Sequence, residues 1–139
     1  MLAARAISVF AALWLGMLWT ICGVVATSLF AILDDRRLAG TIAGEFFHIA
    51  TWLGVASGAL LWLLLAVRRS ASRTLVTWIA VTALPPLANE LALLPFMGTA
   101  REAGNMALFG MLHLGSVALF AVACLGALML VLRLTRPAG

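Results

Sequence analysis

Four long apolar stretches constrain what this 139-residue chain can fold into more than any other feature of its sequence. Each meets the roughly 20 residues that an α-helix needs to cross about 30 Å of hydrocarbon. Hydrophobic residues make up 65% of the chain, and the 10% that are charged lie mostly in the gaps between the stretches. Soluble proteins do not have such a composition. The sequence therefore predicts an all-α integral membrane protein with four transmembrane helices.

We expect these helices to form an antiparallel bundle that makes up a single domain over residues 1–139. The predicted helices span residues 7–33, 41–67, 74–94 and 105–132. Pro85 and Pro86 fall inside the third helix, and because each removes a backbone donor, a kink is expected there. A loop over residues 96–104 is expected to separate the third helix from the fourth.

The arginines predict the orientation of the bundle. Basic residues in short loops stay on the cytoplasmic side of a membrane, and acidic residues contribute little. Six arginines fall on one side of the predicted bundle: Arg5, Arg68, Arg69, Arg73, Arg133 and Arg136. Three fall on the other: Arg36, Arg37 and Arg101. Both termini are therefore predicted to lie in the cytoplasm.

The formal net charge of +4 does not indicate nucleic-acid binding in this chain. The arginines cluster at helix ends, where they meet lipid headgroups. Every basic residue is arginine and tyrosine is absent, a bias expected of a GC-rich bacterial genome. We expect a multi-pass protein of the bacterial inner membrane. Its expected partners are the lipid bilayer and either other membrane subunits or further copies of the chain.

Ionisable residues inside the apolar stretches point to a candidate site. Glu45 and His48 are three residues apart and so are neighbours on one helix face. Counted from the predicted outer helix ends, His48, Glu90 and His113 fall at similar depth on three different helices. Charged groups within a membrane are costly and by default face the bundle interior, a cavity or one another. The sequence therefore predicts a polar layer in the outer third of the bundle.

A single transition-metal ion is the leading hypothesis for this layer. Bundle proteins with di-metal carboxylate centres use two Glu-x-x-His motifs and two further glutamates, whereas this chain has one such motif. Imidazole suits copper, zinc and iron, and a methionine thioether favours Cu(I). The candidate metal ligands are His48, His113, Glu90, Glu45 and Met106. We expect a binding protein rather than an enzyme, with copper handling or tolerance as its function.

Two alternatives stay open. The first is a redox module that binds haem b, with His48 and His113 as the axial ligands from two helices. The second is an accessory subunit of a larger membrane complex, in which hydrogen-bonded or ionic pairs hold the helices in register. A proton relay through the same residues is less favoured, because a transporter normally carries polar groups through the whole membrane thickness.

Several other residues are interpreted as packing residues. Cys22 and Cys124 fall in the middle of their helices, where isolated thiols behave as small apolar groups. Gly54 and Gly58 form a Gly-x-x-x-Gly pair deep in the second helix, which predicts close contact with another helix. Trp14 is expected to join an aromatic belt near the inner membrane interface.

Four short segments carry a resemblance to a known family. They are Trp14-Leu15-Gly16, VVATSLFAIL from Val24 to Leu33, Ala39-Gly40 with Gly44 and Phe47, and Phe109-x-x-x-His113-x-x-Ser116. These segments resemble the four-helix membrane family called domain of unknown function 4149. That family is similar to a human transmembrane protein linked to platinum-drug resistance and is grouped with CopD-like copper-resistance membrane proteins. The resemblance implies a four-helix bundle linked to metal tolerance, with His113 and Ser116 at matching positions.

Overall fold

The structure is a computed structural model that describes residues 2–135, and every regular element in that range is helical. In chain order these are α1 (Leu2–Thr20), η1 (Ile21–Val25), α2 (Ala26–Ile32), α3 (Arg36–Val67), α4 (Arg73–Ala88), η2 (Asn89–Leu93), α5 (Leu94–Glu102) and α6 (Met106–Leu134). They join into four spans that are each long and apolar enough to cross a membrane. The predicted fold class, an all-α protein with four membrane-spanning helices, is confirmed.

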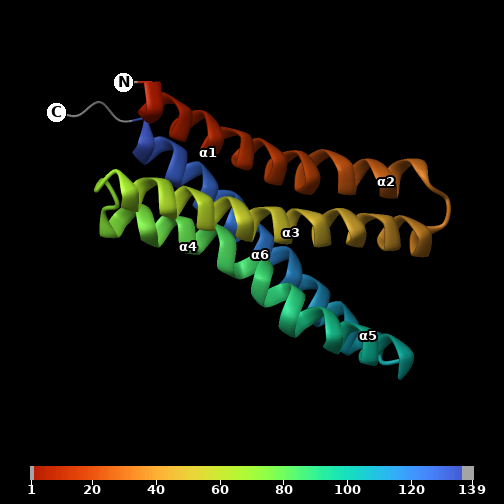
Figure 1. Ribbon diagram of the computed structural model, residues 1–139. Helices are drawn as coiled ribbons and strands as arrows, with labels where there is room; N and C mark the ends of the chain where they lie inside the picture. Colours follow the sequence, from red (N-terminus) through yellow and green to blue (C-terminus); the bar gives the residue numbers. More distant parts are fainter. Residues whose placement is uncertain (1, 136–139) are drawn as a thin grey trace.

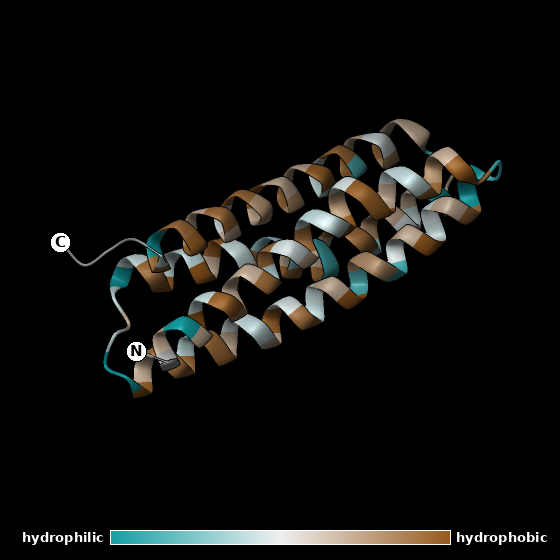
Figure 2. Ribbon diagram, turned by 90° about the horizontal axis from the view of Figure 1, so that it is seen from above, coloured by the Kyte–Doolittle hydropathy of each residue, from teal (hydrophilic) through white to brown (hydrophobic). Residues whose placement is uncertain are grey.

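The four spans pack as two helical hairpins. α1 packs against α3 and α6, and α4 packs against the same two helices, so each span has two antiparallel neighbours (Figure 1). We call the end that holds Arg5, Arg68 and Arg133 the inner end, and the opposite end the outer end. Hydrophilic positions gather mainly at these two ends, whereas the ribbon between them is largely hydrophobic (Figure 2). This pattern is that of a bundle surrounded by lipid rather than by water.

The two hairpins are packed together in the inner half and diverge in the outer half (Figure 1). α2 packs against α3, and α5 packs against α6. The buried hydrophobic cluster belongs to the region where the hairpins are joined, and it comprises Ile7, Ala11, Trp14, Leu18, Leu61, Leu65, Ile79, Ala123, Ala127 and Leu130. The four spans therefore pack together in the inner half of the bundle, whereas in the outer half each hairpin packs mainly within itself.

The Gly-x-x-x-Gly pair of α3 makes the predicted close helix contact. A Cβ on Gly54 would lie 3.3 Å from Trp14 Nε1, and one on Gly58 would lie 3.3 Å from Trp14 Cη2 and from Ala83 Cβ. The two glycines leave a flat strip against which the indole of α1 packs. Trp14 is consequently buried. Its expected position in an interfacial belt is wrong.

α3 begins five residues earlier than predicted, at Arg36 instead of residue 41. Asp35 is its N-cap, and the Asp35 Oδ1 atom accepts hydrogen bonds from the backbone N–H groups of Arg37 at 2.8 Å and Leu38 at 3.1 Å. An N-cap carboxylate satisfies N–H groups that have no partner within the helix. The cap provided by Asp35 therefore allows α3 to begin at the charged residues Arg36 and Arg37.

The third span differs most from expectation, because it does not end at residue 94. Pro85 and Pro86 both remain inside α4, and the helix then continues through η2 and α5 to Glu102. Pro95 falls in the first turn of α5, where a missing N–H is tolerated. Met97 and Ala100 are buried, and α5 packs against α6. The predicted loop over residues 96–104 is thus wrong, since packing against α6 holds this polar segment in a helix.

Two turns of the bundle are π-helical, namely η1 in the first span and η2 in the third. A π-helical turn carries i→i+5 hydrogen bonds and so accommodates an extra residue within an α-helix. Such turns are rare, and they occur frequently at functional sites. They place Cys22 in η1 and Glu90 in η2.

Candidate functional site

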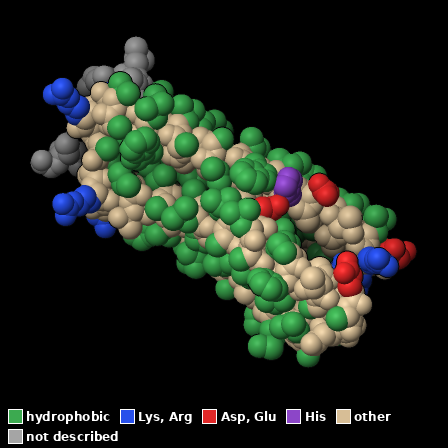
Figure 3. Space-filling view, turned by 60° about the horizontal axis from the view of Figure 1, so that its bottom comes forward, with side chains coloured by type: hydrophobic (Ala, Val, Ile, Leu, Met, Phe, Trp, Pro, Cys, Tyr) green, Lys and Arg blue, Asp and Glu red, His purple; other side chains and the backbone are tan. Residues whose placement is uncertain are grey.

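His48 and Glu90 form the one ion pair among the described residues. His48 Nδ1 of α3 lies 2.5 Å from Glu90 Oε1 of η2, within hydrogen-bonding distance. The imidazole side chain is 50% exposed and the carboxylate side chain 14% exposed. Figure 3 shows a histidine against an acidic side chain on a surface formed largely by hydrophobic side chains. This pair links the two hairpins.

The pair lies deeper than the sequence suggested. His48 follows the start of α3 at Arg36 by 12 residues, and Glu90 precedes the end of α5 at Glu102 by 12 residues. At 1.5 Å per residue, each is about 18 Å from the outer end of its span. Both spans are longer than predicted at that end, and this places the pair about two fifths of the way along each span, just beyond the outer third.

The surroundings of the pair are apolar and partly unsatisfied. Trp52, one turn further along α3, presents its ring edge to His48, with 6.4 Å between the ring centroids. Asn89, the neighbour of Glu90, is buried, and its Oδ1 atom has no hydrogen-bond partner among the described residues. A buried carbonyl oxygen without a partner is destabilising. The sequence did not reveal this orphan atom, because its burial arises from contacts between helices.

His113 does not join the pair. Its ring stacks on that of Phe109, one turn away on α6, with 6.1 Å between centroids and an angle of 8°. The level of α6 relative to α3 is fixed by Phe47 and Phe120, whose ring centroids are 4.6 Å apart. His113 precedes Phe120 by seven residues, about 10 Å along the helix. The expected common depth of His48 and His113 is therefore wrong, and this offset does not favour a haem held between them.

The remaining candidate ligands also lie apart. Glu45 is exposed on α3, and Met106 is exposed at the first residue of α6. Within residues 2–135, no group of three or more His, Cys, Asp or Glu side chains is arranged to hold a metal ion. Of the five predicted metal ligands, the structure brings together His48 and Glu90. Metal binding by this set remains a prediction.

A second pair of chemically active side chains was missed at the sequence level. The thiol of Cys124 in α6 donates to Cys22 Sγ in η1, with the two sulfur atoms 3.7 Å apart. Both cysteines are free and partly buried. The indole Nε1–H of Trp19 also donates to the Cys124 carbonyl oxygen at 3.2 Å. The expectation that the two thiols are isolated is wrong, whereas their packing among apolar residues agrees with the partial burial of both.

Simple counting could not have found this thiol pair. Cys22 precedes the end of α2 at Ile32 by 10 residues, whereas Cys124 follows the start of α6 at Met106 by 18. At 1.5 Å per residue these offsets are about 15 and 27 Å, which would place the thiols at different depths. The divergence of the two hairpins (Figure 1) means that their outer ends are no common reference.

The two pairs share one structural feature. Glu90 is supplied by η2 and Cys22 by η1, and each π-helical turn thus contributes one partner to a contact with another span. The pairs remain separate, because no cluster of three such side chains exists among the described residues. The middle of the bundle therefore carries a nitrogen–oxygen pair and a sulfur–sulfur pair on different helix contacts.

Comparison with known proteins gives one family. No curated protein and no solved structure matches the chain. A family model described as a domain of unknown function (DUF4149) matches residues 9–106. This range includes Cys22, His48 and Glu90, whereas His113 and Cys124 lie beyond it. Since the match covers more than half of the 139 residues, the chain belongs to the DUF4149 family.

Proposed function

We propose that this membrane protein binds a soft monovalent metal ion, Cu(I) in particular, between Cys22 and Cys124, and that it serves metal handling or tolerance. The distance of 3.7 Å between the two sulfur atoms carries the proposal. Thiolate sulfur is a ligand type that favours Cu(I), Zn(II) and iron–sulfur clusters. Zn(II) takes four ligands in structural sites, so a site of two sulfur atoms fits Cu(I) better. The resemblance of the sequence implies a link of the family to CopD-like copper-resistance proteins and to the platinum-resistance protein, and such a link would agree with a soft metal as ligand.

Two sulfur ligands suffice for a linear site. With metal–sulfur bonds of roughly 2.3 Å, a two-coordinate ion needs sulfur atoms about 4.6 Å apart. The thiols would therefore have to separate by about 1 Å. Cys22 lies in a π-helical turn, whose backbone already departs from regular α-helix, and Cys124 is partly buried at the edge of the hydrophobic cluster. A small rotation of either side chain would open the site.

The apolar surroundings favour an uncharged complex. If Cu(I) binds one thiolate and one thiol, a single proton leaves and the complex carries no net charge. An isolated charge at membrane depth would be costly. No histidine or carboxylate joins the two thiols in the described part of the chain, so the donor set stays purely sulfur. Such a set discriminates against Zn(II) and Mg(II), which favour tetrahedral nitrogen and sulfur ligands or oxygen ligands.

The test is Ag(I) binding, since Ag(I) is a redox-stable substitute for Cu(I). Purified protein in detergent should bind one equivalent per chain, measured by elemental analysis after desalting. The Cys22→Ser, Cys124→Ser double variant should lose this binding, whereas the His48→Ala, His113→Ala double variant should retain it. Equal binding by the wild type and the cysteine variant would overturn the proposal. If the histidine variant alone loses Ag(I) binding, the metal ligands are the imidazoles and not the thiols.

A second candidate function is an accessory subunit of a membrane assembly, and the half-exposed His48 favours it. Ionisable residues at membrane depth usually face protein or a cavity rather than lipid. A partner helix over this face would cover the imidazole and its neighbour Trp52, which is 47% exposed. Gentle detergent extraction followed by native size analysis tests this. A species larger than one chain that shrinks with His48→Ala supports it, and a monomer in native lipid nanodiscs contradicts it.

A further inference from the structure

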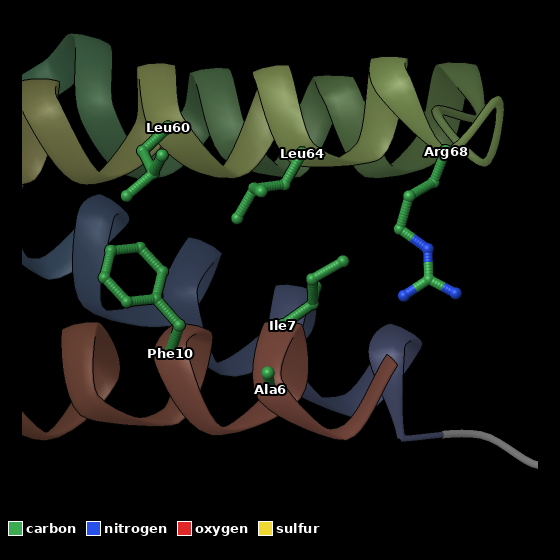
Figure 4. A pocket seen from close by; sticks show the side chains of 6 residues that line it. All are labelled: Ala6, Ile7, Phe10, Leu60, Leu64 and Arg68. Atoms are coloured by element: carbon green, nitrogen blue, oxygen red, sulfur yellow. The ribbon is translucent and has the colours of Figure 1, made fainter. Parts of the chain in front are cut away.

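An apolar groove runs between α1 and α3 at the inner end of the bundle. It has a volume of about 290 Å³ and is lined by Ala6, Ile7, Phe10, Leu60, Leu64 and Arg68. Figure 4 shows the side chains of Ile7 and Phe10 pointing towards α3 and those of Leu60 and Leu64 pointing towards α1. Five of the six lining residues are hydrophobic, so the groove suits a hydrocarbon chain.

Arg68 is the one charged residue of the groove. It is the C-cap residue of α3, and its guanidinium extends across the inner mouth of the groove towards α1 (Figure 4). The one ion pair among residues 2–135 is that of His48 with Glu90, and Arg68 thus has no carboxylate partner there. A guanidinium presents donors in a planar fork that matches a phosphate group. The mouth of the groove is therefore suited to a phosphate.

The whole inner end has the same sign of charge. Five arginines of the described residues belong to the helix ends and the turn at this end, namely Arg5, Arg68, Arg69, Arg73 and Arg133. Figure 3 shows basic side chains at the end of the molecule that holds the chain termini. All five acidic residues of the chain lie elsewhere, in the outer half or near mid-span: Asp34, Asp35, Glu45, Glu90 and Glu102. The inner end therefore attracts anions, and it does so at the level of the lipid headgroups.

We propose that this groove is a binding site for an anionic phospholipid, with one acyl chain along the groove and the phosphate on Arg68. Basic pockets between transmembrane helices are known to bind anionic headgroups. The acyl chain gains little from the groove itself, because the surrounding lipid tails are equally apolar. Selection between lipids must therefore come from the charge at the mouth. This site is independent of metal binding.

The direct test compares lipids bound to purified protein. The protein is reconstituted in nanodiscs of phosphatidylcholine with a minor share of phosphatidylglycerol, then released into detergent, and bound lipids are counted by native mass spectrometry. One basic residue near the surface favours an anionic lipid by roughly fivefold. We expect such an enrichment in the wild type and its loss in Arg68→Gln. The same enrichment in Arg68→Gln would overturn the proposal.

A matched control separates the groove from the arginine-rich end as a whole. Arg133 lies in the last turn of α6 at the same end but does not line the groove. Arg133→Gln removes the same charge and should retain most of the enrichment. An equal loss in Arg68→Gln and Arg133→Gln would assign the enrichment to the collective charge, which contradicts a site at Arg68.

Two further arms distinguish a lipid from a free anion. Ala6→Phe adds a ring to the groove wall without changing any charge, so it should lower phosphatidylglycerol retention while Arg68 stays in place. Inorganic phosphate, added in excess over lipid, should not displace the bound phosphatidylglycerol. If phosphate displaces it and Ala6→Phe has no effect, the site is an anion site alone and the proposed lipid site is wrong.

Discussion

The sulfur atoms of Cys22 and Cys124 lie 3.7 Å apart although 102 residues separate the two cysteines in the chain. Their contact ties η1 of the first span to α6, just as His48 and Glu90 tie α3 to η2. The two hairpins diverge in the outer half of the bundle (Figure 1), and each contact joins one hairpin to the other. The chemically active side chains are therefore concentrated at a structural junction.

The thiol pair makes a direct prediction about cross-linking. Mild oxidation of the protein in membranes with iodine should join Cys22 to Cys124 within one chain, because a small side-chain rotation brings sulfur atoms at 3.7 Å into bonding distance. The measurement is the mass loss of two hydrogens in the intact protein, with peptide mapping of the bond. Each single Cys→Ser variant is the control. Cross-links exclusively between chains would contradict the contact.

The ion pair between the hairpins should contribute to stability. Hydrogen bonds between transmembrane helices contribute about 1 kcal/mol or less, so His48→Ala and Glu90→Gln should each lower the stability by about that amount. The double variant should cost less than the sum of the single variants, as expected for groups in direct contact. Denaturation in mixed micelles measures the three changes.

Glu45→Gln is the matched control for the comparison of the His48 and Glu90 variants. Glu45 lies one turn from His48 on α3 and is exposed, with no hydrogen-bond partner among the described residues. Its substitution should leave the stability within experimental error. If the His48 and Glu90 effects were additive, the two side chains would not interact, and the linkage of the hairpins would have to rest on apolar packing.

Gly126 should tolerate no larger residue. A Cβ at this position would lie 2.9 Å from Thr82 Oγ1 and 3.0 Å from Val81 Cγ1 on α4. Thr82 is buried and donates to the Trp78 carbonyl oxygen at 2.7 Å, so it has little room to move. Overpacking of this kind costs about 1–3 kcal/mol. Gly126→Ala should lower the melting temperature in detergent.

Gly16 provides the comparison for that substitution, because a Cβ there meets nothing within 4 Å. Alanine is favoured over glycine in a helix by up to about 1 kcal/mol. Gly16→Ala should therefore keep or slightly raise the melting temperature. A similar destabilisation by Gly16→Ala and Gly126→Ala would show that steric contact with α4 is not the cause.

Asn89 should be replaceable by an apolar residue at no cost. Its Oδ1 atom is buried without a partner, and such an atom costs about 1–3 kcal/mol. Asn89→Leu keeps the branching at Cγ and removes the orphan oxygen, so it should raise the melting temperature. Asn89→Asp would bury a carboxylate and should lower it. Destabilisation by leucine as large as that by aspartate would indicate that the amide has a partner supplied by another molecule.

The predicted orientation can be checked by labelling single cysteines in the Cys22→Ser, Cys124→Ser background. Asp34→Cys lies in the turn between α2 and α3, and Ser70→Cys lies in the turn between α3 and α4. With the arginine-rich inner end in the cytoplasm, a membrane-impermeant maleimide should label residue 34 in intact cells. Residue 70 should react after permeabilisation of the membrane. The reverse pattern would invert the topology.

The third span shows most clearly how far local sequence patterns predict the helices. They identified an apolar helix around Pro85 and Pro86, but they ended it near Leu94 because Pro95 and a polar segment follow. In the structure the helix continues to Glu102, since Met97 and Ala100 are buried and α5 packs against α6. Contacts with α6 outweighed the local preference of this polar segment for a loop. Such contacts between distant segments cannot be read from the order of residues.

The sequence by itself determined the number of spans and the helical class, because apolar length decides whether a helix can cross hydrocarbon without help from other segments. It also identified His48 and Glu90 as unusual residues. Only the tertiary structure decided that these two meet just beyond the outer third, that His113 stacks on Phe109 instead, and that Cys22 meets Cys124. Depth and pairing depend on the relative shift and divergence of four helices, and these are set by packing between helices at contacts such as Trp14 on Gly54.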